Sequence, residues 1–436
     1  MIGRRSAAHV VGALLALSAH SPAWAEEGTP ILRAHSRTVD VRDGDRLLRG
    51  VWNADPASAL DVYDARRTRG GKRVTFISDI DSLSFEVRPG DRRDFTILLD
   101  DRDSCRTRVS AMAGAERVGS DSTTDPVTVP IAIRHGKLHL GGTINGSETL
   151  DLIFDTGADM NVLYPSALRR GARIRFDGTA SNSGTGGTTV RQTSRDNRLE
   201  VAGLRWERET ILYVEKQADR ADGIIGYPAF EDRIVEIDYD RMVLRVHDTL
   251  PPHAGFARTA LLPVGSLTAV AADLAGGWNQ ASGPFILDTG GTGTVMVNQA
   301  FATAHGLRGA LRRLGTSRSR GVGSGVVRNE VLLLPELSVA GLVLHGVPVH
   351  VELPDPGNAA PPGGALCMDV LRRFNTLLDY PAGQAYFKPS ATFATPFRPG
   401  IFARPWPAIA LGAICLAALA ALARSVRRRA RPLAGR

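Results

Sequence analysis

Short runs in which hydrophobic and polar residues alternate fill residues 26–395, and Gly, Pro and Asp separate the runs. Alternation with a period of two is typical of β-strands that bury one face. The stretch 26–119 contains "RTVDVRDG", "LDVYDA", "RVTFISD", "LSFEVRPG" and "DFTILLD". Their regular spacing predicts a small β-sandwich-like N-terminal domain, and the Ser-, Thr- and Asp-rich residues 120–126 predict a linker after it.

From Val127 onward the sequence pattern occurs twice. Asp-Thr-Gly at 155–157 recurs at 288–290, and three further segments recur in the same order: "GTGGTTVR" with "GVGSGVVR", "LEVAGL" with "LSVAGL", and "IDY" with "LDY". Four landmarks in one order indicate an internal duplication. The pattern therefore predicts two homologous β lobes, residues 127–250 and 255–395, with a short helix after each Asp-Thr-Gly.

Both ends of the chain carry apolar segments. Residues 1–25 combine an Arg pair, an apolar run and "AWA" before Glu26, as a secretory signal peptide does. An uncleaved N-terminal anchor is the alternative, although the run is short for a spanning helix.

Near the C-terminus, a linker (396–405) leads to the uncharged apolar residues 406–423 and then to an Arg-rich tail (424–436). These residues predict one transmembrane helix with a basic cytoplasmic tail. A removable C-terminal sorting signal has the same form. The two ends together predict a single-pass protein of the bacterial inner membrane whose residues 26–405 face the periplasm.

The charge distribution argues against nucleic acid as a partner. The formal net charge is +8, and arginines within residues 1–25 and 424–436 account for all of it. Residues 26–405 are formally neutral, so the sequence shows no basic patch of the kind that binds phosphates.

Cysteine and histidine predict neither a disulfide framework nor a metal site. Cys105 and Cys367 fall in different predicted domains and Cys415 falls in the apolar segment, so unpaired thiols are favoured over a single cross-domain disulfide. His135 and His139 are four residues apart, but no second Cys or His pair matches them. No zinc ion or other cofactor is expected.

The candidate chemistry lies in "LIFDTGADMNVL" (152–163) and "FILDTGGTGTVMV" (285–297). Each apolar strand delivers an aspartate at its end, although Asp and Gly are poor strand formers. Two lobes related by a pseudo-two-fold axis can bring Asp155 and Asp288 face to face, where the carboxyl groups would share one proton. One carboxylate then serves as general base toward water while the other, protonated, polarises a carbonyl. Residues 290–294, "GGTGT", lack the lysine of a phosphate-binding loop, and no Gly-x-Ser-x-Gly motif occurs.

These motifs resemble the aspartic peptidases, and the bacterial retropepsin-like group in particular. The resemblance covers roughly residues 127–395 and rests on the two Asp-Thr-Gly segments, the glycine-rich hairpins after them, and "DGIIG" (222–226). In the second copy, Cys367 takes the place of the last glycine of "DGIIG". The family implies a mainly β, bilobal aspartic-peptidase fold, here preceded by the β-sandwich-like domain and followed by the transmembrane helix.

The resemblance also implies a role for individual residues. It makes Asp155 and Asp288 the catalytic dyad. The residues that would support the dyad are Thr156, Gly157, Thr289 and Gly290. The residues that would form the substrate-covering flaps are Gly184, Thr185, Gly186, Gly187, Gly323, Ser324 and Gly325.

The resulting hypothesis is a membrane-anchored periplasmic aspartic endopeptidase. Its partner would be a protein or peptide substrate, its active unit a monomer, and its reaction free of metal and cofactor. A catalytically silent peptide- or envelope-binding module on the same fold is the alternative. A structural envelope protein dominated by residues 26–119 is a third.

Overall fold

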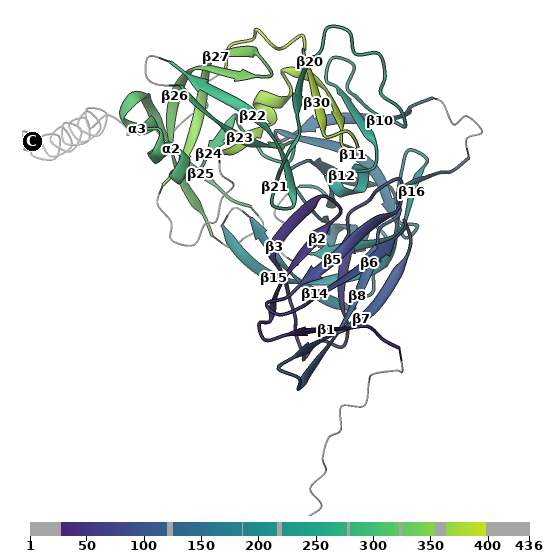
Figure 1. Ribbon diagram of the computed structural model, residues 1–436. Helices are drawn as coiled ribbons and strands as arrows, with labels where there is room; N and C mark the ends of the chain where they lie inside the picture. Colours follow the sequence, from purple (N-terminus) through teal and green to yellow (C-terminus); the bar gives the residue numbers. More distant parts are fainter. Residues whose placement is uncertain are drawn as a thin grey trace, which may run out of the picture.

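The computed structural model describes residues 28–119, 125–184, 186–215, 220–276, 280–321, 325–353 and 363–397. Strands dominate these residues (Figure 1), so the predicted mainly β class is confirmed. The predicted signal peptide and the apolar segment 406–423 lie outside them. Within the described ranges, no helix has the length and apolar character needed to cross a membrane.

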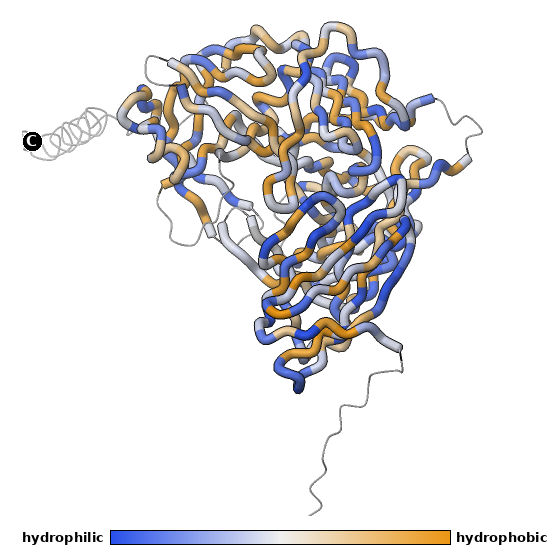
Figure 2. The backbone as a smooth tube through the Cα atoms, viewed as in Figure 1, coloured by the Kyte–Doolittle hydropathy of each residue, from blue (hydrophilic) through white to orange (hydrophobic). Residues whose placement is uncertain are grey.

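Two four-stranded sheets form the N-terminal unit, residues 28–119, with strand orders β1-β7-β8-β4 and β3-β2-β5-β6. Alternate residues of both sheets point into one buried cluster, in which the rings of Phe76 and Phe95 lie 4.7 Å apart. Figure 2 shows the alternation along these strands as changing hydropathy. The free cysteine Cys105 is buried in the same cluster. The strands are β1 Ile31–Ala34, β2 Thr38–Asp43, β3 Arg46–Asn53, β4 Asp61–Ala65, β5 Lys72–Ile77, β6 Ser82–Val87, β7 Arg92–Leu99 and β8 Asp103–Ala111.

Residues 116–247 carry the first repeat. Its elements are β9 Glu116–Arg117, β10 Val127–Arg134, β11 Lys137–Ile144, β12 Leu150–Asp155, β13 Asn161–Leu163, α1 Pro165–Arg169, β14 Gly178–Gly184, β15 Gly187–Val201, β16 Leu204–Tyr213, β17 Gly223–Gly226, the 3₁₀ helix η1 Tyr227–Phe230, β18 Ile234–Asp238 and β19 Val243–His247. Strand β9 falls inside the predicted N-terminal domain, yet it pairs with β16 of the first repeat.

Residues 257–389 carry the second repeat. Its elements are β20 Ala257–Ala260, β21 Leu262–Val264, β22 Leu267–Ala275, β23 Ala281–Asp288, β24 Val295–Val297, α2 Gln299–Ala304, α3 Leu307–Ala310, β25 Arg312–Ser319, β26 Val327–Val339, β27 Leu342–Glu352, β28 Gly364–Cys367, α4 Met368–Leu371, β29 Phe374–Asp379 and β30 Gln384–Pro389. Helices α1 and α2 lie where the sequence predicts a short helix after each Asp-Thr-Gly.

One strand-pairing scheme occurs in both repeats. In the first repeat, β12 pairs antiparallel with β11 and parallel with β17, while β13 pairs antiparallel with β17 and parallel with β16. In the second repeat, β23 pairs in the same senses with β22 and β28, and β24 with β28 and β27. Each repeat also carries a long antiparallel hairpin, β14–β15 or β25–β26. The pairing thus gives every element near the first aspartate a counterpart near the second.

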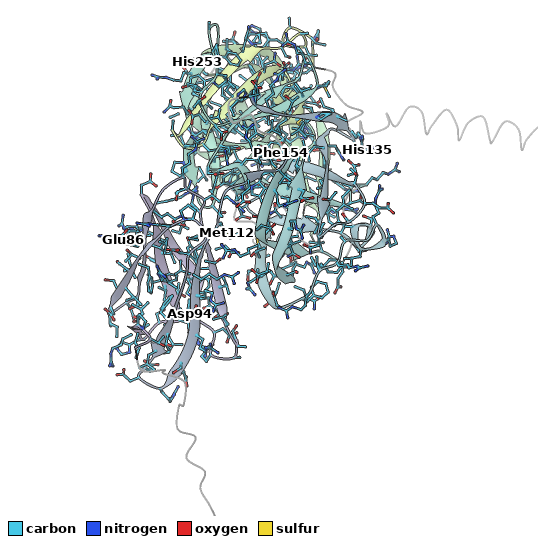
Figure 3. All side chains as sticks on the ribbon, turned by 90° about the vertical axis from the view of Figure 1, so that its right-hand side faces the viewer. Glu86, Asp94, Met112, His135, Phe154 and His253 are labelled. Carbon is cyan, nitrogen blue, oxygen red and sulfur yellow. The ribbon has the colours of Figure 1, made fainter. Side chains whose placement is uncertain are left out.

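The repeats are joined by a shared sheet and a shared core. Strands β10, β19 and β18 of the first repeat continue into β29, β30 and β20 of the second, with β18 and β29 paired antiparallel. One large hydrophobic cluster includes buried residues of both repeats. In the view turned by 90° from Figure 1, the N-terminal unit, marked by Glu86 and Asp94, lies below and to the left of Phe154 in the first repeat (Figure 3). The shared sheet and core hold the two aspartate loops in a fixed relation to each other.

Candidate active site

Asp155 and Asp288 end two buried parallel-paired strands. In β12 and β23 the three residues before the aspartate are buried, and the aspartate itself is partly exposed. The register places Asp155 opposite Gly226 and Asp288 opposite Cys367. The two predicted site residues therefore occupy equivalent positions at the ends of equivalent strands.

The loops that carry the aspartates are joined by the two threonines. The backbone N–H of Thr156 donates to Oγ1 of Thr289 at 3.0 Å, and the N–H of Thr289 donates to Oγ1 of Thr156 at 3.1 Å. Each hydroxyl in turn donates to a backbone carbonyl of the other repeat, at Leu287 or Phe154, over 2.6 Å. Both threonines are buried. This reciprocal arrangement of four hydrogen bonds fixes one loop against the other.

Glycine is needed at both loops because the opposite carboxyl group occupies the space that a side chain would fill. A Cβ atom at Gly157 would lie 2.9 Å from Cγ of Asp288, and one at Gly290 would lie 2.2 Å from Oδ2 of Asp155. The Cβ atom at Gly157 would also lie 3.2 Å from Oδ1 of Asp155, so the two carboxyl groups face each other across this position.

Burial raises the pKa of Asp155 to about 8, and repulsion by Asp288 adds to the rise, while the N–H of Gly157 and the charge of Lys137 oppose it. Burial also raises the pKa of Asp288, against hydrogen bonds from the backbone of Gly291 and Gly290. Two like charges this close cannot both form easily, so the pair keeps one proton at neutral pH. The ionisations belong to the pair rather than to either residue.

Cys367, which departs from the glycine of the first repeat, and Gly291 fit each other in the second repeat. A Cβ atom at Gly226 would lie 2.7 Å from the carbonyl oxygen of Ala158, so no side chain fits there. Its counterpart Cys367 is buried, and its Sγ lies 2.9 Å from where a Cβ atom of Gly291 would be. The second glycine of Asp-Thr-Gly-Gly thus provides the space for the Cys367 thiol, whose pKa burial raises well above the usual range.

The predicted flap residues that the structure describes lie at two hairpin tips that touch. Gly184 and Gly187 are paired at the end of β14 and β15, and Gly186 between them has a φ of +94°. The N–H of Gly325 donates to the carbonyl oxygen of Gly186 at 3.0 Å. The structure therefore brings Gly186 and Gly325 together, whereas Thr185, Gly323 and Ser324 lie outside the described residues.

Sequence reasoning missed Lys137. Its charge lowers the pKa of both aspartates. The turn before Lys137 contacts the loop that carries Asp288. A Cβ atom at Gly136 would be 3.4 Å from Cγ2 of Thr292, and the N–H of Leu138 donates to the carbonyl oxygen of Thr289 at 3.2 Å. A lysine after a hairpin turn is an ordinary surface pattern, so no sequence signal singled it out.

A family model described as "Aspartyl protease" matches residues 140–229. The resemblance to aspartic peptidases of the pepsin and retropepsin type is thereby confirmed. The match includes Asp155, the β14–β15 hairpin and Gly226, and it ends before Asp288. Among solved structures, the aspartic proteinase from Irpex lacteus aligns at 12% identity with a TM-score of 0.44, covering 61% of this chain and 98% of that one. No curated protein matches the sequence significantly.

Proposed function

We propose that this protein is an aspartic endopeptidase in which Asp155 and Asp288 form the catalytic dyad. The observation that carries the proposal is the position of the two carboxyl groups, which face each other at Gly157 on loops that Thr156 and Thr289 tie together. The aspartyl-protease match over residues 140–229 supports the same activity. Both aspartates come from one chain, which favours a monomeric active unit with two homologous lobes.

In the proposed reaction, the ionised carboxylate removes a proton from water while the protonated carboxyl group donates to the carbonyl oxygen of the scissile peptide bond. Attack of the water oxygen gives a tetrahedral diol. The carboxyl group that took the water proton then donates it to the amide nitrogen, while the other carboxylate takes a proton from the diol and the C–N bond breaks. The pair is then singly protonated as at the start. No covalent enzyme intermediate forms, and neither metal nor cofactor takes part in these steps.

The flaps would cover a peptide substrate. The residues proposed for this role are Gly184, Thr185, Gly186, Gly187, Gly323, Ser324 and Gly325. Glycine exposes backbone groups that can hydrogen-bond an extended peptide in the manner of an added strand. Because Gly186 and Gly325 are hydrogen-bonded to each other here, the tips would have to separate before a polypeptide enters.

Anchoring and location are proposals that rest on the sequence of the two ends. The signal peptide (1–25), the transmembrane helix (406–423) and the basic tail (424–436) support an inner-membrane protein with a periplasmic peptidase region. The domain division proposed is an N-terminal domain at 26–119, a linker at 120–126, lobes at 127–250 and 255–395, and a second linker at 396–405.

The test uses the full-length protein in detergent micelles, with a peptide library between pH 4 and pH 8 and a statine-type inhibitor. We expect cleavage by the wild type and none by Asp155→Asn or Asp288→Asn, with unchanged circular dichroism. Cleavage that survives either substitution would refute the dyad. Peptide binding without cleavage at every pH would instead favour the catalytically silent binding module.

A further inference from the structure

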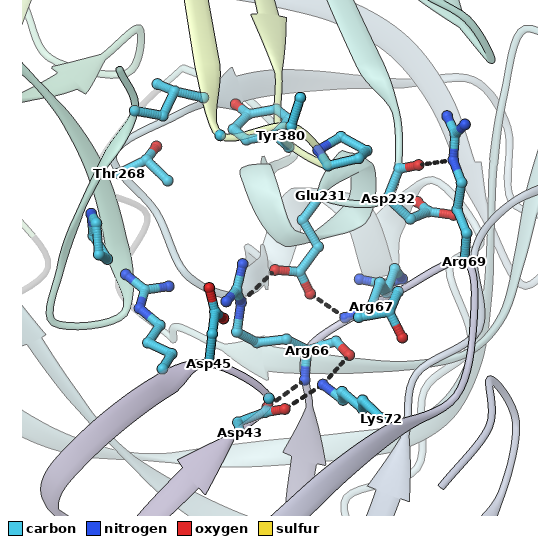
Figure 4. A pocket seen from close by; sticks show the side chains of 18 residues that line it. Asp43, Asp45, Arg66, Arg67, Arg69, Lys72, Glu231, Asp232, Thr268 and Tyr380 are labelled. Carbon is cyan, nitrogen blue, oxygen red and sulfur yellow. Dashed lines mark hydrogen bonds and ion pairs between the residues drawn. The ribbon is translucent and has the colours of Figure 1, made fainter.

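Arg67 reaches from the N-terminal unit into the first repeat. It lies between β4 and β5 and is 4% exposed. Its guanidinium donates to the carboxylate of Glu209, to the carbonyl oxygen of Pro228 and, at 2.9 Å, to the carbonyl oxygen of Ala113. Its backbone N–H donates to Glu231, as the close view of this junction shows (Figure 4). A buried arginine with this many partners belongs to the interior of the protein rather than to a surface contact.

Glu209 connects Arg67 to the strand beside Asp155 through two further hydrogen bonds. Its Oε2 accepts from Nδ2 of Asn161 at 2.8 Å, and Oδ1 of Asn161 accepts from the N–H of Gly226 at 3.1 Å. Gly226 lies opposite Asp155 in the parallel pairing of β12 with β17. An ionised carboxylate accepts and never donates, so Glu209 fixes which end of the Asn161 amide faces Gly226.

The second repeat lacks this polar connection. The strand register makes Val295 the counterpart of Asn161 and Val347 the counterpart of Glu209, and both valines are fully buried. There the N–H of Cys367, the counterpart of Gly226, donates to the backbone carbonyl of Thr294 at 2.7 Å. At this position the second repeat uses a backbone hydrogen bond, whereas the first uses side chains that lead to Arg67.

We propose that Arg67 is a positioning residue for Asp155, acting through Glu209, Asn161 and Gly226, and that residues 28–119 are a permanent part of the catalytic unit. The inference rests on the proposed peptidase function. Without Arg67, Glu209 would be a buried carboxylate lacking its cation, and it would take up a proton. A protonated carboxyl group can donate as well as accept, so Glu209 would no longer fix which end of the Asn161 amide faces Gly226.

Burial already raises the pKa of Glu209, and the charge of Arg67 opposes that rise. Removal of Arg67 therefore pushes the carboxyl group toward its neutral form. The hydrogen bond to Gly226 is then lost, and the strand that flanks Asp155 loosens.

The variants that test this are Arg67→Met and Asn161→Val, the latter giving the first repeat the residue type of the second. Arg66→Met is the matched control. Arg66 pairs with Glu231 at 3.2 Å in the same junction, with a side chain 32% exposed, and has no contact with Asn161 among the described residues. All three are made in the full-length protein.

The first readout is hydrogen exchange at the Gly226 amide, which does not require peptidase activity. We expect exchange about tenfold faster in Arg67→Met and Asn161→Val, and unchanged in Arg66→Met. The second readout is peptide cleavage, where kcat should fall about 100-fold with a small change in KM. The alkaline limb of the pH profile should move to lower pH, because water entering the loosened loop reduces the desolvation of Asp155.

The proposal would be overturned if Arg67→Met and Arg66→Met had the same rate of hydrogen exchange at Gly226 and the same kcat. If the wild type cleaves nothing but the Gly226 amide exchanges faster in Arg67→Met than in the wild type, the peptidase function is refuted and the link from Arg67 to Gly226 is supported. If Arg67→Met does not fold, Asn161→Val carries the same two expectations, and normal Gly226 exchange in that variant would equally overturn the link.

Discussion

Thr156 and Thr289 each accept a hydrogen bond from the other's backbone N–H, so the two aspartate loops are fixed by one symmetrical contact. Replacing either threonine by valine keeps the shape but leaves a buried N–H without its acceptor. We expect Thr156→Val to lower the free energy of unfolding by about 2 kcal/mol, and Thr289→Val to do the same.

Urea unfolding monitored by tryptophan fluorescence would measure these losses. Thr156→Ser is the matched control, because serine retains the hydroxyl group and should cost less than about 1 kcal/mol. A loss below about 0.5 kcal/mol for Thr156→Val would show that the hydroxyl group contributes little.

The shared proton predicts a pH dependence of stability. An unfolded aspartate titrates near its ordinary value of 3.8, whereas burial and Asp288 raise the pKa of Asp155 to about 8. Between these values the folded protein binds a proton that the unfolded chain has released, so the free energy of unfolding falls as the pH rises. Asp155→Asn should therefore gain stability relative to the wild type from pH 4 to pH 8. Parallel stability curves for the two proteins over this range would contradict the shared proton.

The strand opposite each aspartate predicts an asymmetry between the repeats. A Cβ atom at Gly226 would meet the carbonyl oxygens of Ala158 and Met160 at 2.7 and 2.8 Å, and these backbone atoms cannot easily move. We expect Gly226→Ala to cost about 2 to 3 kcal/mol of unfolding free energy, and Cys367→Ala, which only removes a sulfur atom, about 1 kcal/mol. Thermal unfolding of the two variants tests the order, and a larger loss for Cys367→Ala would reverse it.

Local pattern was sufficient to predict the strands that carry the aspartates. Apolar runs ending in Asp-Thr-Gly gave Asp155 and Asp288, and the repeated flanks correctly placed Cys367 at the counterpart of Gly226. Pattern was weaker in the N-terminal unit, where β1 is only four residues long and β8 buries the polar Thr107 between Arg106 and Arg108. Neither β1 nor β8 shows the clear alternation of hydrophobic and polar residues that predicted the other strands, such as "RVTFISD".

Contacts between distant segments could not be predicted in this way. Arg67 stands in "RRTRG", which reads as an exposed turn, and its burial depends on Glu209, 142 residues later. The pairing of β18 with β29 and the contact of Gly186 with Gly325 likewise depend on how the two repeats meet. A sequence period reports which face of a strand is buried, but not which strand or charge will cover it.

The hairpin tips predict a difference between adjacent glycines. Gly186 and Gly187 both have positive φ, so alanine strains the backbone at either position. Only at Gly186 would the added Cβ atom also meet Gly325, 2.5 Å from its carbonyl oxygen, whereas Gly187 faces open space. If the tips close over substrate, Gly186→Ala should raise KM about tenfold more than Gly187→Ala. Equal KM values for the two variants would show that the contact between the tips does not contribute to substrate binding.

The junction predicts that the N-terminal unit cannot be removed as a propeptide. A protein beginning at Val127 would lose Arg66 and Arg67, and Glu209 and Glu231, both buried, would lose these cations. An uncompensated buried carboxylate costs about 3 to 5 kcal/mol when its partner is removed. We therefore expect the truncated protein to unfold at lower urea than the full-length protein and to cleave no peptide. If residues 26–119 instead blocked the site as a propeptide, the truncated protein would be folded and more active, which the same two assays would detect.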